Sequence, residues 1–561
     1  KQLHNIQSNI HFSWKPLIVA CEKGHIEIVK LLLNDERVDI NEIDEFGQTP
    51  FLIACEKGQT EIVELLLTDK RSDVNKTTNS SVSPFWISCQ SGNLDIVKLL
   101  LKDERTDINK SEKSTGTTPF YIACYNGHIE VAKLLLSDSR VDVNKANISD
   151  QTPFFVACKN GHIEIVETLL NDKRVDVNKS NKDKVRPLFI ACEKEHIEIV
   201  KLLLNDQRIF INKKNHYGET CFYIACEKGH LEIVKLLLND KRVDVNKVDR
   251  LTWAPLYIAC CEGHIEIVKL LLNDERVDIN KANGDGVTPF YKACYYKYIE
   301  IVKLLLNDKR IDVNKSGKYS GTPFLKACEE SRSIAIVKLL LNDDRTDINK
   351  VNDQDGETPF YKVCGKRHID VVKLFLKDER IDINKAKNDG ATPFYKACEE
   401  GHIEIVKLLL SDKRVEINKA KNDGESPFYK ACKKGYFEIV KLLLNDKRVD
   451  INQANNNGFS PFYIACLDGN TEIVKLLLND KRFVDINKPE NEDGETPFYI
   501  ACGKGYVEIV KLLLNDQRVD VNKADNDGMT PFYVAYETGR TEVMEEILAS
   551  GRKESEFAFK K

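Results

Sequence analysis

The sequence predicts an all-α fold, in which helix-loop-helix units stack into an elongated and curved solenoid. The first observation is a slot that recurs sixteen times along 561 residues, at steps of 34 with one step of 35 and two of 36. Proline fills every slot but one, which holds Cys221. A fixed period between about 20 and 50 residues is the signature of repeat architectures. The second observation is that each copy holds two apolar segments at helical spacing, too small to form a core alone.

Residues 389–424 represent the repeated unit, and they predict a first helix that begins at Pro393. Thr392 belongs to the residue types that cap helices, and proline suits the first helical position because no backbone donor is needed there. The helix should stop near Gly401, since glycine tolerates the left-handed conformation that ends many helices.

A second helix is expected directly afterwards, from His402 to Leu410. Ile405, Leu408 and Leu409 fall on one face at helical spacing, so this face should pack against neighbouring units. The first helix should add Phe394, Ala397 and Cys398 to the same core.

The unit should end in a short finger that leads to the next proline. Residues 415–418 are typical of extended chain, and Asn422-Asp423-Gly424 is typical of a tight turn. We therefore expect a short β-hairpin or loop finger between each second helix and the next first helix.

The segment DGATPFYKACEEGHIEIVKLLL closely resembles the ankyrin repeat, whose pattern is D-x-x-G-x-T-P-L-H-x-A-A-x-x-G-H-x-E-I-V-x-L-L-L. The resemblance covers about residues 15–548 and implies a protein-binding solenoid without catalysis. An aromatic residue such as Tyr395 replaces the family's histidine, whose hydrogen-bonding role is expected to be lost. Cysteine replaces the second alanine. The glycine that usually ends the second helix is absent, so we expect an Asn or Asp to cap that end.

Three regions are expected along the chain. Residues 1–14 form an N-terminal flank or a broken repeat, residues 15–548 form sixteen repeats in one solenoid, and residues 549–561 form a charged tail. Insertions predict altered stacking near 331–356 and 483–495. The chain starts without methionine and directly on a repeat, so we expect a piece of a longer protein.

Composition narrows the possible functions. The net charge is -5 with 30% charged residues, which argues against a chain-wide field for nucleic acids or membranes. No apolar run approaches the roughly 20 residues that span a bilayer, so we expect no membrane insertion by this segment. Seventeen cysteines recur mostly at one buried slot, which predicts free thiols in a reducing, cytoplasmic compartment. Cys221 and Cys261 lie outside that slot and are expected to be partly exposed.

Metal, cofactor and catalytic sites are not predicted. Cys-x-x-x-His recurs, as in Cys398 and His402, but an intervening glycine places the two residues in different helices, so zinc is not expected. Asn-rich turns lack the alternating carboxylates of calcium loops. Neither a phosphate-binding glycine loop nor a catalytic serine motif occurs. We therefore expect no enzyme activity, no cofactor and no small-molecule substrate.

Most candidate binding residues lie in or beside one column of equivalent positions, three residues after each repeat proline. The column is apolar in the first eight copies, as at Ile122, Ile190, Ile224 and Ile258. It becomes lysine in five successive copies, at Lys292, Lys326, Lys362, Lys396 and Lys430, flanked by Tyr291, Tyr361, Tyr395 and Tyr429. Tyr295 and Tyr296 replace the usual residues of repeat 9, and Trp253 lies at a finger tip. These are the candidate partner-binding residues.

Two interpretations of the lysine column stay open. One is a groove for an acidic protein segment at repeats 9–13, beside an apolar groove in repeats 2–8. The other is duplication of one ancestral repeat, with each lysine reaching solvent and neutralised by glutamates such as Glu399 and Glu400.

A protein-protein interaction scaffold, binding through the concave inner-helix face and the finger tips, is the function that we expect from the resemblance. The chain is expected to be monomeric. An alternative is the cytosolic arm of a membrane channel or membrane-anchored protein. A further alternative is nucleic-acid binding through the lysines, which the acidic balance disfavours.

Overall fold

The computed structural model describes residues 15–330, 334–483 and 485–552, and this part of the chain contains 32 α-helices. The helices come in pairs, one pair per repeat, as the sequence predicts. The chain divides into two compact units, residues 1–281 and 282–561, which are described separately.

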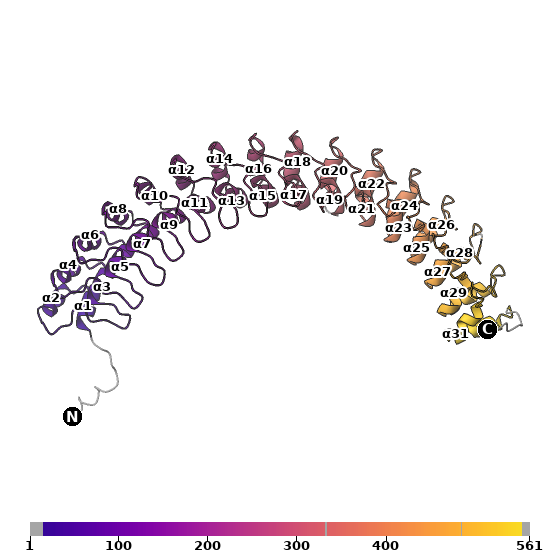
Figure 1. Cartoon of the computed structure of the whole chain (residues 1–561), viewed down its shortest axis with the longest axis horizontal. Coiled ribbons are helices and arrows are strands. Elements are labelled where there is room, and N and C mark those ends of the chain that lie inside the picture. The colour runs from indigo at the N-terminus through magenta and orange to yellow at the C-terminus, as the bar shows by residue number, and fades with distance from the viewer. Residues whose placement is uncertain (1–14, 331–333, 484, 553–561) are drawn as a thin grey trace, which may run out of the picture. The chain divides into compact units, whose positions relative to one another are not determined.

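The first unit contains α1 to α16. The odd-numbered helices are α1 (Pro16–Lys23), α3 (Pro50–Glu56), α5 (Pro84–Ser91), α7 (Pro119–Asn126), α9 (Pro153–Asn160), α11 (Pro187–Glu193), α13 (Cys221–Lys228) and α15 (Pro255–Glu262). The even-numbered helices are α2 (Ile26–Leu33), α4 (Thr60–Thr68), α6 (Leu94–Lys102), α8 (Ile129–Ser137), α10 (Ile163–Leu170), α12 (Ile197–Asn205), α14 (Leu231–Asn239) and α16 (Ile265–Leu272). Within this unit the odd-numbered helices lie on the inner side of a curved stack (Figure 1).

The second unit contains α17 to α32, with the odd-numbered helices again on its inner side (Figure 1). These are α17 (Pro289–Tyr296), α19 (Pro323–Glu329), α21 (Pro359–Gly365), α23 (Pro393–Glu399), α25 (Pro427–Lys433), α27 (Pro461–Leu467), α29 (Pro497–Lys504) and α31 (Pro531–Glu537). The even-numbered helices are α18 (Ile299–Asn307), α20 (Ile334–Leu341), α22 (Ile369–Leu376), α24 (Ile403–Ser411), α26 (Phe437–Leu444), α28 (Thr471–Leu478), α30 (Val507–Leu514) and α32 (Thr541–Ala549).

The first helix of the representative unit begins as predicted. The Thr392 hydroxyl accepts a hydrogen bond of 3.1 Å from the backbone N–H of Tyr395, and Pro393 follows as the first helical residue. Gly401 has a φ of +76°, which explains why glycine recurs between the two helices. His402 is the cap before α24 rather than a helical residue.

The core of each unit lies between successive helix pairs. Phe394, Ala397 and Cys398 of α23 are at most 1% exposed, and Ile405 and Leu409 of α24 are fully buried. Leu408 is only half-buried, and Val406 is the third fully buried residue of α24. The buried face of α24 therefore includes Val406 in place of Leu408, so it is rotated slightly about the helix axis from the face that the spacing predicts.

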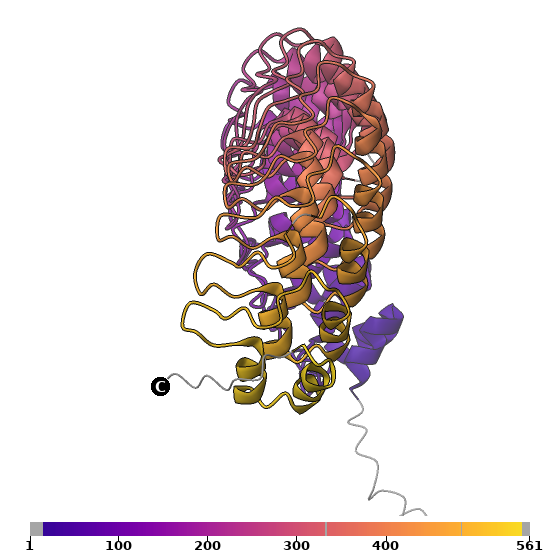
Figure 2. The same cartoon turned by 90° about the vertical axis from the view of Figure 1, so that its right-hand side faces the viewer.

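The fingers consist of turns and loops, and the described residues contain no strand beyond an isolated bridge between Gly317 and Gly321. They leave the helices on one side of the second unit (Figure 2). Neighbouring fingers are joined at their tips. The backbone N–H of Asn422 donates to the carbonyl of Asp389 at 2.9 Å, and its side-chain amide donates to the carbonyl of Asn388 at 3.1 Å.

The end of a second helix, α32 apart, receives a hydrogen bond from an arginine of the next repeat, as α24 shows. The Arg448 guanidinium donates to the carbonyl of Leu410, the last leucine of α24, at 2.7 Å. The Asp446 carboxylate fixes this guanidinium by a 2.6 Å ion pair. The cap position of α24 holds Asp412, as expected, and its backbone N–H donates to the carbonyl of Leu409. The side-chain donor, which was not expected, comes from 38 residues further along the chain.

An asparagine joins the same two repeats at the base of the fingers. The Asn418 side-chain amide donates to the carbonyl of Arg448 at 2.7 Å, and its oxygen accepts from the N–H of Asp450 at 2.8 Å. Each repeat therefore satisfies polar backbone groups of its neighbour, in addition to burying apolar surface against it.

The expected end regions are only partly described. Residues 1–14, 331–333 and 553–561 lie outside the described residues, as does residue 484. The tail was expected from residue 549, but α32 includes Ala549, and Arg552 occupies the capping position of its repeat. Its guanidinium donates to the carbonyl of Leu514 at 2.7 Å. The single continuous solenoid and the altered stacking near the insertions stay predictions.

Candidate functional site

The lysine column lies on the inner helices of the second unit. Lys326, Lys362, Lys396 and Lys430 are each paired with carboxylates. The Lys396 ammonium lies 2.8 Å from Glu399 and 2.6 Å from Glu400 on its own helix turn. Lys430 reaches back to Glu399 at 3.4 Å and across to Glu425 at 3.3 Å.

The same alternation continues towards the start of the unit. Lys362 lies 2.5 Å from Glu357 and 3.3 Å from Glu329, and Lys326 lies 3.1 Å from Glu329. The lysine side chains from Lys326 to Lys430 are between 13% and 24% exposed. The column is thus a ladder of alternating charges rather than an uncompensated basic stripe.

Electrostatics of the ladder follow from this pairing. Burial of Lys396 disfavours its charged form, but the hydrogen bonds to Glu399 and Glu400 outweigh burial and raise the pKa of the ammonium. Burial likewise opposes ionisation of Glu399, and the hydrogen bond from Lys396 outweighs it and lowers the pKa of that carboxyl. Both partners are therefore charged at neutral pH.

Lys292 differs from the other four lysines because aromatic rings surround it. Its ammonium lies 5.3 Å from the ring centre of Tyr295 and 5.6 Å from that of Tyr296. The Lys326 ammonium also lies 5.3 Å from the Tyr295 ring, so two cations contact one ring. Cation–π contacts of this kind contribute roughly 0.5–1 kcal/mol at exposed sites.

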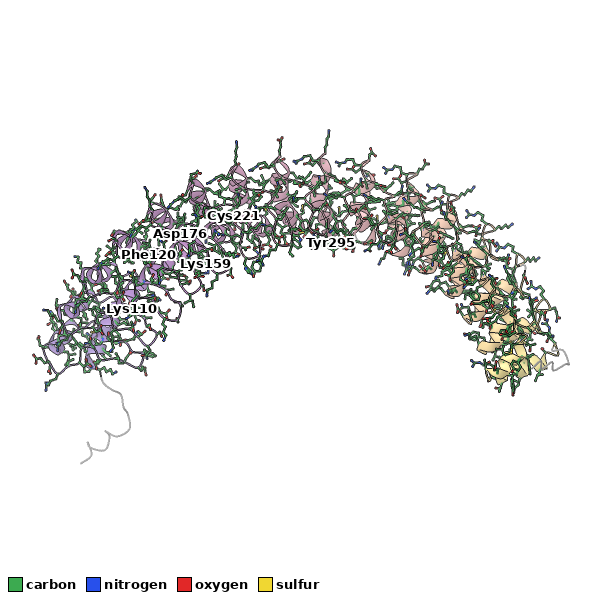
Figure 3. All side chains as sticks on the ribbon, viewed as in Figure 1. Lys110, Phe120, Lys159, Asp176, Cys221 and Tyr295 are labelled. Atoms are coloured by element: carbon green, nitrogen blue, oxygen red, sulfur yellow. The ribbon has the colours of Figure 1, made fainter. Side chains whose placement is uncertain are left out.

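Tyr295 and Tyr296 form an exposed aromatic pair at the end of α17. Their side chains are 39% and 45% exposed, and their rings meet edge to face with centres 5.0 Å apart. Figure 3 places Tyr295 on the inner side of the second unit. Lys297 follows with a φ of +66°, where most other repeats have glycine. A lysine in this conformation is uncommon and mildly strained.

The four flanking tyrosines are buried instead of lining a surface. Tyr291, Tyr361, Tyr395 and Tyr429 are at most 5% exposed. The Tyr395 hydroxyl donates to Glu425 of the next finger at 3.0 Å, so a hydrogen-bonding role is retained where we expected its loss. Burial raises the pKa of these hydroxyls, Tyr395 included. The four rings therefore offer little exposed surface to a partner.

The apolar residues of the column in the first unit are also buried. Ile122, Ile190, Ile224 and Ile258 are between 2% and 8% exposed, so they pack between helices and offer little surface to a partner. A column at constant spacing shows which residues are equivalent, but not how far each side chain is covered by the next repeat.

Trp253 is half-buried at its finger, with its ring 5.2 Å from that of Tyr257. The most exposed apolar side chains on neighbouring tips are Leu251 at 62% and Tyr217 at 65%. Both were missed by sequence reasoning. Each occupies a turn position where most other repeats have a polar residue, which is the signal that could have identified them.

The recurrent cysteines and histidines have structural roles. The Nε2 of His402 donates to the carbonyl of Gly365 in the previous repeat at 3.1 Å, and Cys398 is buried in α23. All seventeen cysteines are buried thiols. Cys221 and Cys261 were expected to be partly exposed, but they are 2% and 8% exposed because neighbouring helices cover them. Burial raises the pKa of Cys55 to about 12.

Metal binding and membrane insertion have no support in the described residues. Within residues 15–330, 334–483 and 485–552, no group of three or more His, Cys, Asp or Glu side chains is arranged to hold a metal ion. Every helix in these ranges is too short or too polar to cross a bilayer.

Paired helices, stacked in register with fingers on one side, define a helical repeat solenoid. A family model of three ankyrin repeats matches nine segments of the chain, most of which overlap. These are residues 1–78, 71–147, 138–215, 154–249, 209–283, 241–317, 324–421, 413–490 and 481–556. The chain belongs to the ankyrin repeat family, whose members are generally protein-protein interaction modules. A comparison with curated proteins found no match.

Proposed function

We propose that this chain is a non-catalytic scaffold that binds other proteins through its inner helices and finger tips. The observation that carries the proposal is the exposed pair Tyr295 and Tyr296 on the inner side of the second unit. Tyrosine is among the residue types enriched at the energetic centre of protein interfaces. Strain at Lys297 adds support, because unfavourable backbone conformations concentrate at functional positions.

The partner segment at this surface is acidic. Lys292 and Lys326 hold their ammonium groups over the Tyr295 ring, where an incoming carboxylate would meet both charge and apolar area. Lys326 is also held by a glutamate, Glu329, but it lies over the exposed Tyr295 ring beside Lys292. The rest of the ladder is less suited, since an acidic segment at repeats 11–13 would have to displace Glu399 or Glu425 from Lys430 without gaining such an exposed ring. We therefore narrow acid recognition from repeats 9–13 to repeats 9 and 10.

Two alternatives rank below this proposal. Nucleic-acid binding through the column is disfavoured by the same carboxylates, which would lie against phosphates. A cytosolic arm of a membrane protein is compatible with a scaffold and concerns the rest of the polypeptide. We also propose a reducing compartment and a monomeric state, the first because seventeen thiols are buried in the core.

The proposal is tested by selecting ligands from a random twelve-residue peptide library displayed on phage, with the immobilised chain as bait. We expect the selected peptides to be rich in Asp and Glu. The double substitution Tyr295→Ala, Tyr296→Ala should weaken their binding about ten-fold, as expected for central interface tyrosines. The measurement is fluorescence anisotropy of the synthetic peptides.

Tyr125→Ala is the matched control. Tyr125 is 45% exposed and occupies the position in repeat 4 that Tyr295 occupies in repeat 9. The Tyr125→Ala variant should bind the peptides as tightly as the unsubstituted chain does. Unchanged binding by the double variant, or an equal loss in the control, would contradict the proposed surface.

A further inference from the structure

A second feature of the inner face is an open pocket of about 460 Å³ between repeats 13 and 14. It lies between α25, α27 and the finger that joins their repeats. Phe459 of the finger, Leu467 at the end of α27 and Asp468 just beyond it are among the lining residues. Of the candidate partner-binding residues that the sequence indicated, Tyr429 lines this pocket.

The pocket has a fixed aromatic wall. Phe459 is half-exposed, and its ring stacks on that of Tyr463, with the ring centres 5.0 Å apart and an angle of 22° between the ring planes. Leu467 is also half-exposed and provides aliphatic surface beside it. Such a wall suits a side chain that has both an apolar stem and a flat polar head.

The carboxylates of the pocket differ in what they contact. Glu425 is engaged by Lys433 at 2.8 Å, Lys430 at 3.3 Å and the Tyr395 hydroxyl. Asp423 lies 3.2 Å from Lys421. These two groups are therefore already compensated by side chains of the protein.

Asp468 is the exception. Its side chain is exposed at the pocket rim, and its carboxylate makes no hydrogen bond or ion pair with any residue in the described part of the chain. Burial raises the pKa of this carboxyl, and Lys433 and Lys504 offset the effect only in part. A cation that entered the pocket would therefore gain an ion pair without displacing an existing one.

We propose that this pocket receives an arginine side chain of a protein partner, with the guanidinium against Asp468 and its flat face on the Phe459 ring. The inference rests on the proposed function, since it assigns a second contact to the same protein-binding face. Arginine fits better than lysine because its planar head stacks on aromatic rings and pairs with carboxylates at the same time. Asp468 supplies the complementary charge, since Asp423 and Glu425 are held by Lys421, Lys430 and Lys433.

The test uses a fluorescein-labelled twelve-residue Gly-Ser peptide with three arginines, and the same peptide with citrulline in their place. Citrulline keeps the shape of arginine and removes its charge. Binding is measured by anisotropy to the full chain and to Asp468→Asn and Leu467→Lys. Lysine is tolerated at the second position, because Lys159 and Lys433 occupy the equivalent place in other repeats.

We expect the arginine peptide to bind more tightly than the citrulline peptide, and Asp468→Asn to weaken it at least three-fold. Leu467→Lys should weaken it further, since its own ammonium would occupy the pocket. The control Glu262→Gln removes one exposed charge at the position in repeat 8 that Asp468 occupies in repeat 14, and should bind normally.

Equal binding of both peptides, no measurable binding, or an equal loss in Glu262→Gln would overturn the proposal. The variant Tyr295→Ala, Tyr296→Ala separates the two hypotheses. It should retain the arginine peptide while losing the acidic ones, so either surface can fail without the other.

Discussion

At the scale of single residues, the repeats differ most informatively where one copy carries a polar group that the others lack. Ser72, Thr106 and Thr346 occupy a buried slot that holds Val or Ile in most copies. Their hydroxyls are buried without a hydrogen-bond partner in the described residues. A buried polar group without a partner costs about 1–3 kcal/mol.

Thr106→Val should therefore stabilise repeat 3 by about 1 kcal/mol, because valine has the same shape without the hydroxyl. The measurement is hydrogen exchange of the α6 amides, which should slow about five-fold. Val141→Thr, the reverse change at the equivalent position of repeat 4, is the control and should speed exchange in α8. Unchanged exchange in Thr106→Val would show that the hydroxyl is satisfied by water.

Sequence reasoning identified which residues are equivalent but not how far each is covered. Lys396 and Ile224 share one column, and the structure pairs the first with glutamates and buries the second. The period supplies register, whereas exposure depends on how the next repeat is rotated and on side-chain length. The exposed pair Tyr295 and Tyr296 could be identified because these residue types differ from those at the same positions of other repeats, although the repeat length is unchanged.

At the scale of helices, the starts and the residue type at the end of the second helix were predictable, but the side chain that donates to that end was not. Thr392 and Pro393 are local signals, and they cap α23 as expected. The end of α24 depends on Arg448, which belongs to the next repeat. A contact across 38 residues leaves no local signal, although the regular recurrence of Asp-x-Arg was visible in the sequence.

Arg448→Ala should destabilise the junction of repeats 12 and 13 by about 1–2 kcal/mol, because it leaves the Leu410 carbonyl and the Asp446 carboxylate without their donor. Hydrogen exchange in α24 and α26 should become about ten-fold faster. Lys447→Ala, at the exposed neighbouring residue, is the matched control and should change little. An effect of equal size in both variants would argue against capping by the arginine.

The same pairs predict an acid transition. The hydrogen bond from Arg448 lowers the pKa of Asp446, and equivalent pairs recur in the other repeats. A carboxyl whose pKa is lower in the folded state stabilises the fold above its unfolded value of about 3.9, and this contribution is lost as pH falls below it. Circular dichroism should therefore show loss of helix below about pH 4. A constant signal down to pH 2 would contradict this account.

At the scale of the whole molecule, each unit is a stack in which neighbouring repeats complete one another's core, caps and finger tips. Such a stack forms an extended inner face that presents different side chains at each repeat. Repetition alone explains the fold of this ankyrin repeat protein, and the departures from repetition are where binding specificity can arise. Tyr295 with Tyr296 and the pocket at Asp468 are two such departures, and we propose both as binding surfaces.

Hydrogen exchange of the chain with and without a selected acidic peptide tests the central claim most directly. Binding to the inner face at repeats 9 and 10 predicts slower exchange at α17 and α19, with α18 and α20 unchanged. The Tyr295→Ala, Tyr296→Ala variant should lose this protection. Protection confined to the even-numbered helices, or equal protection in the variant, would contradict the account.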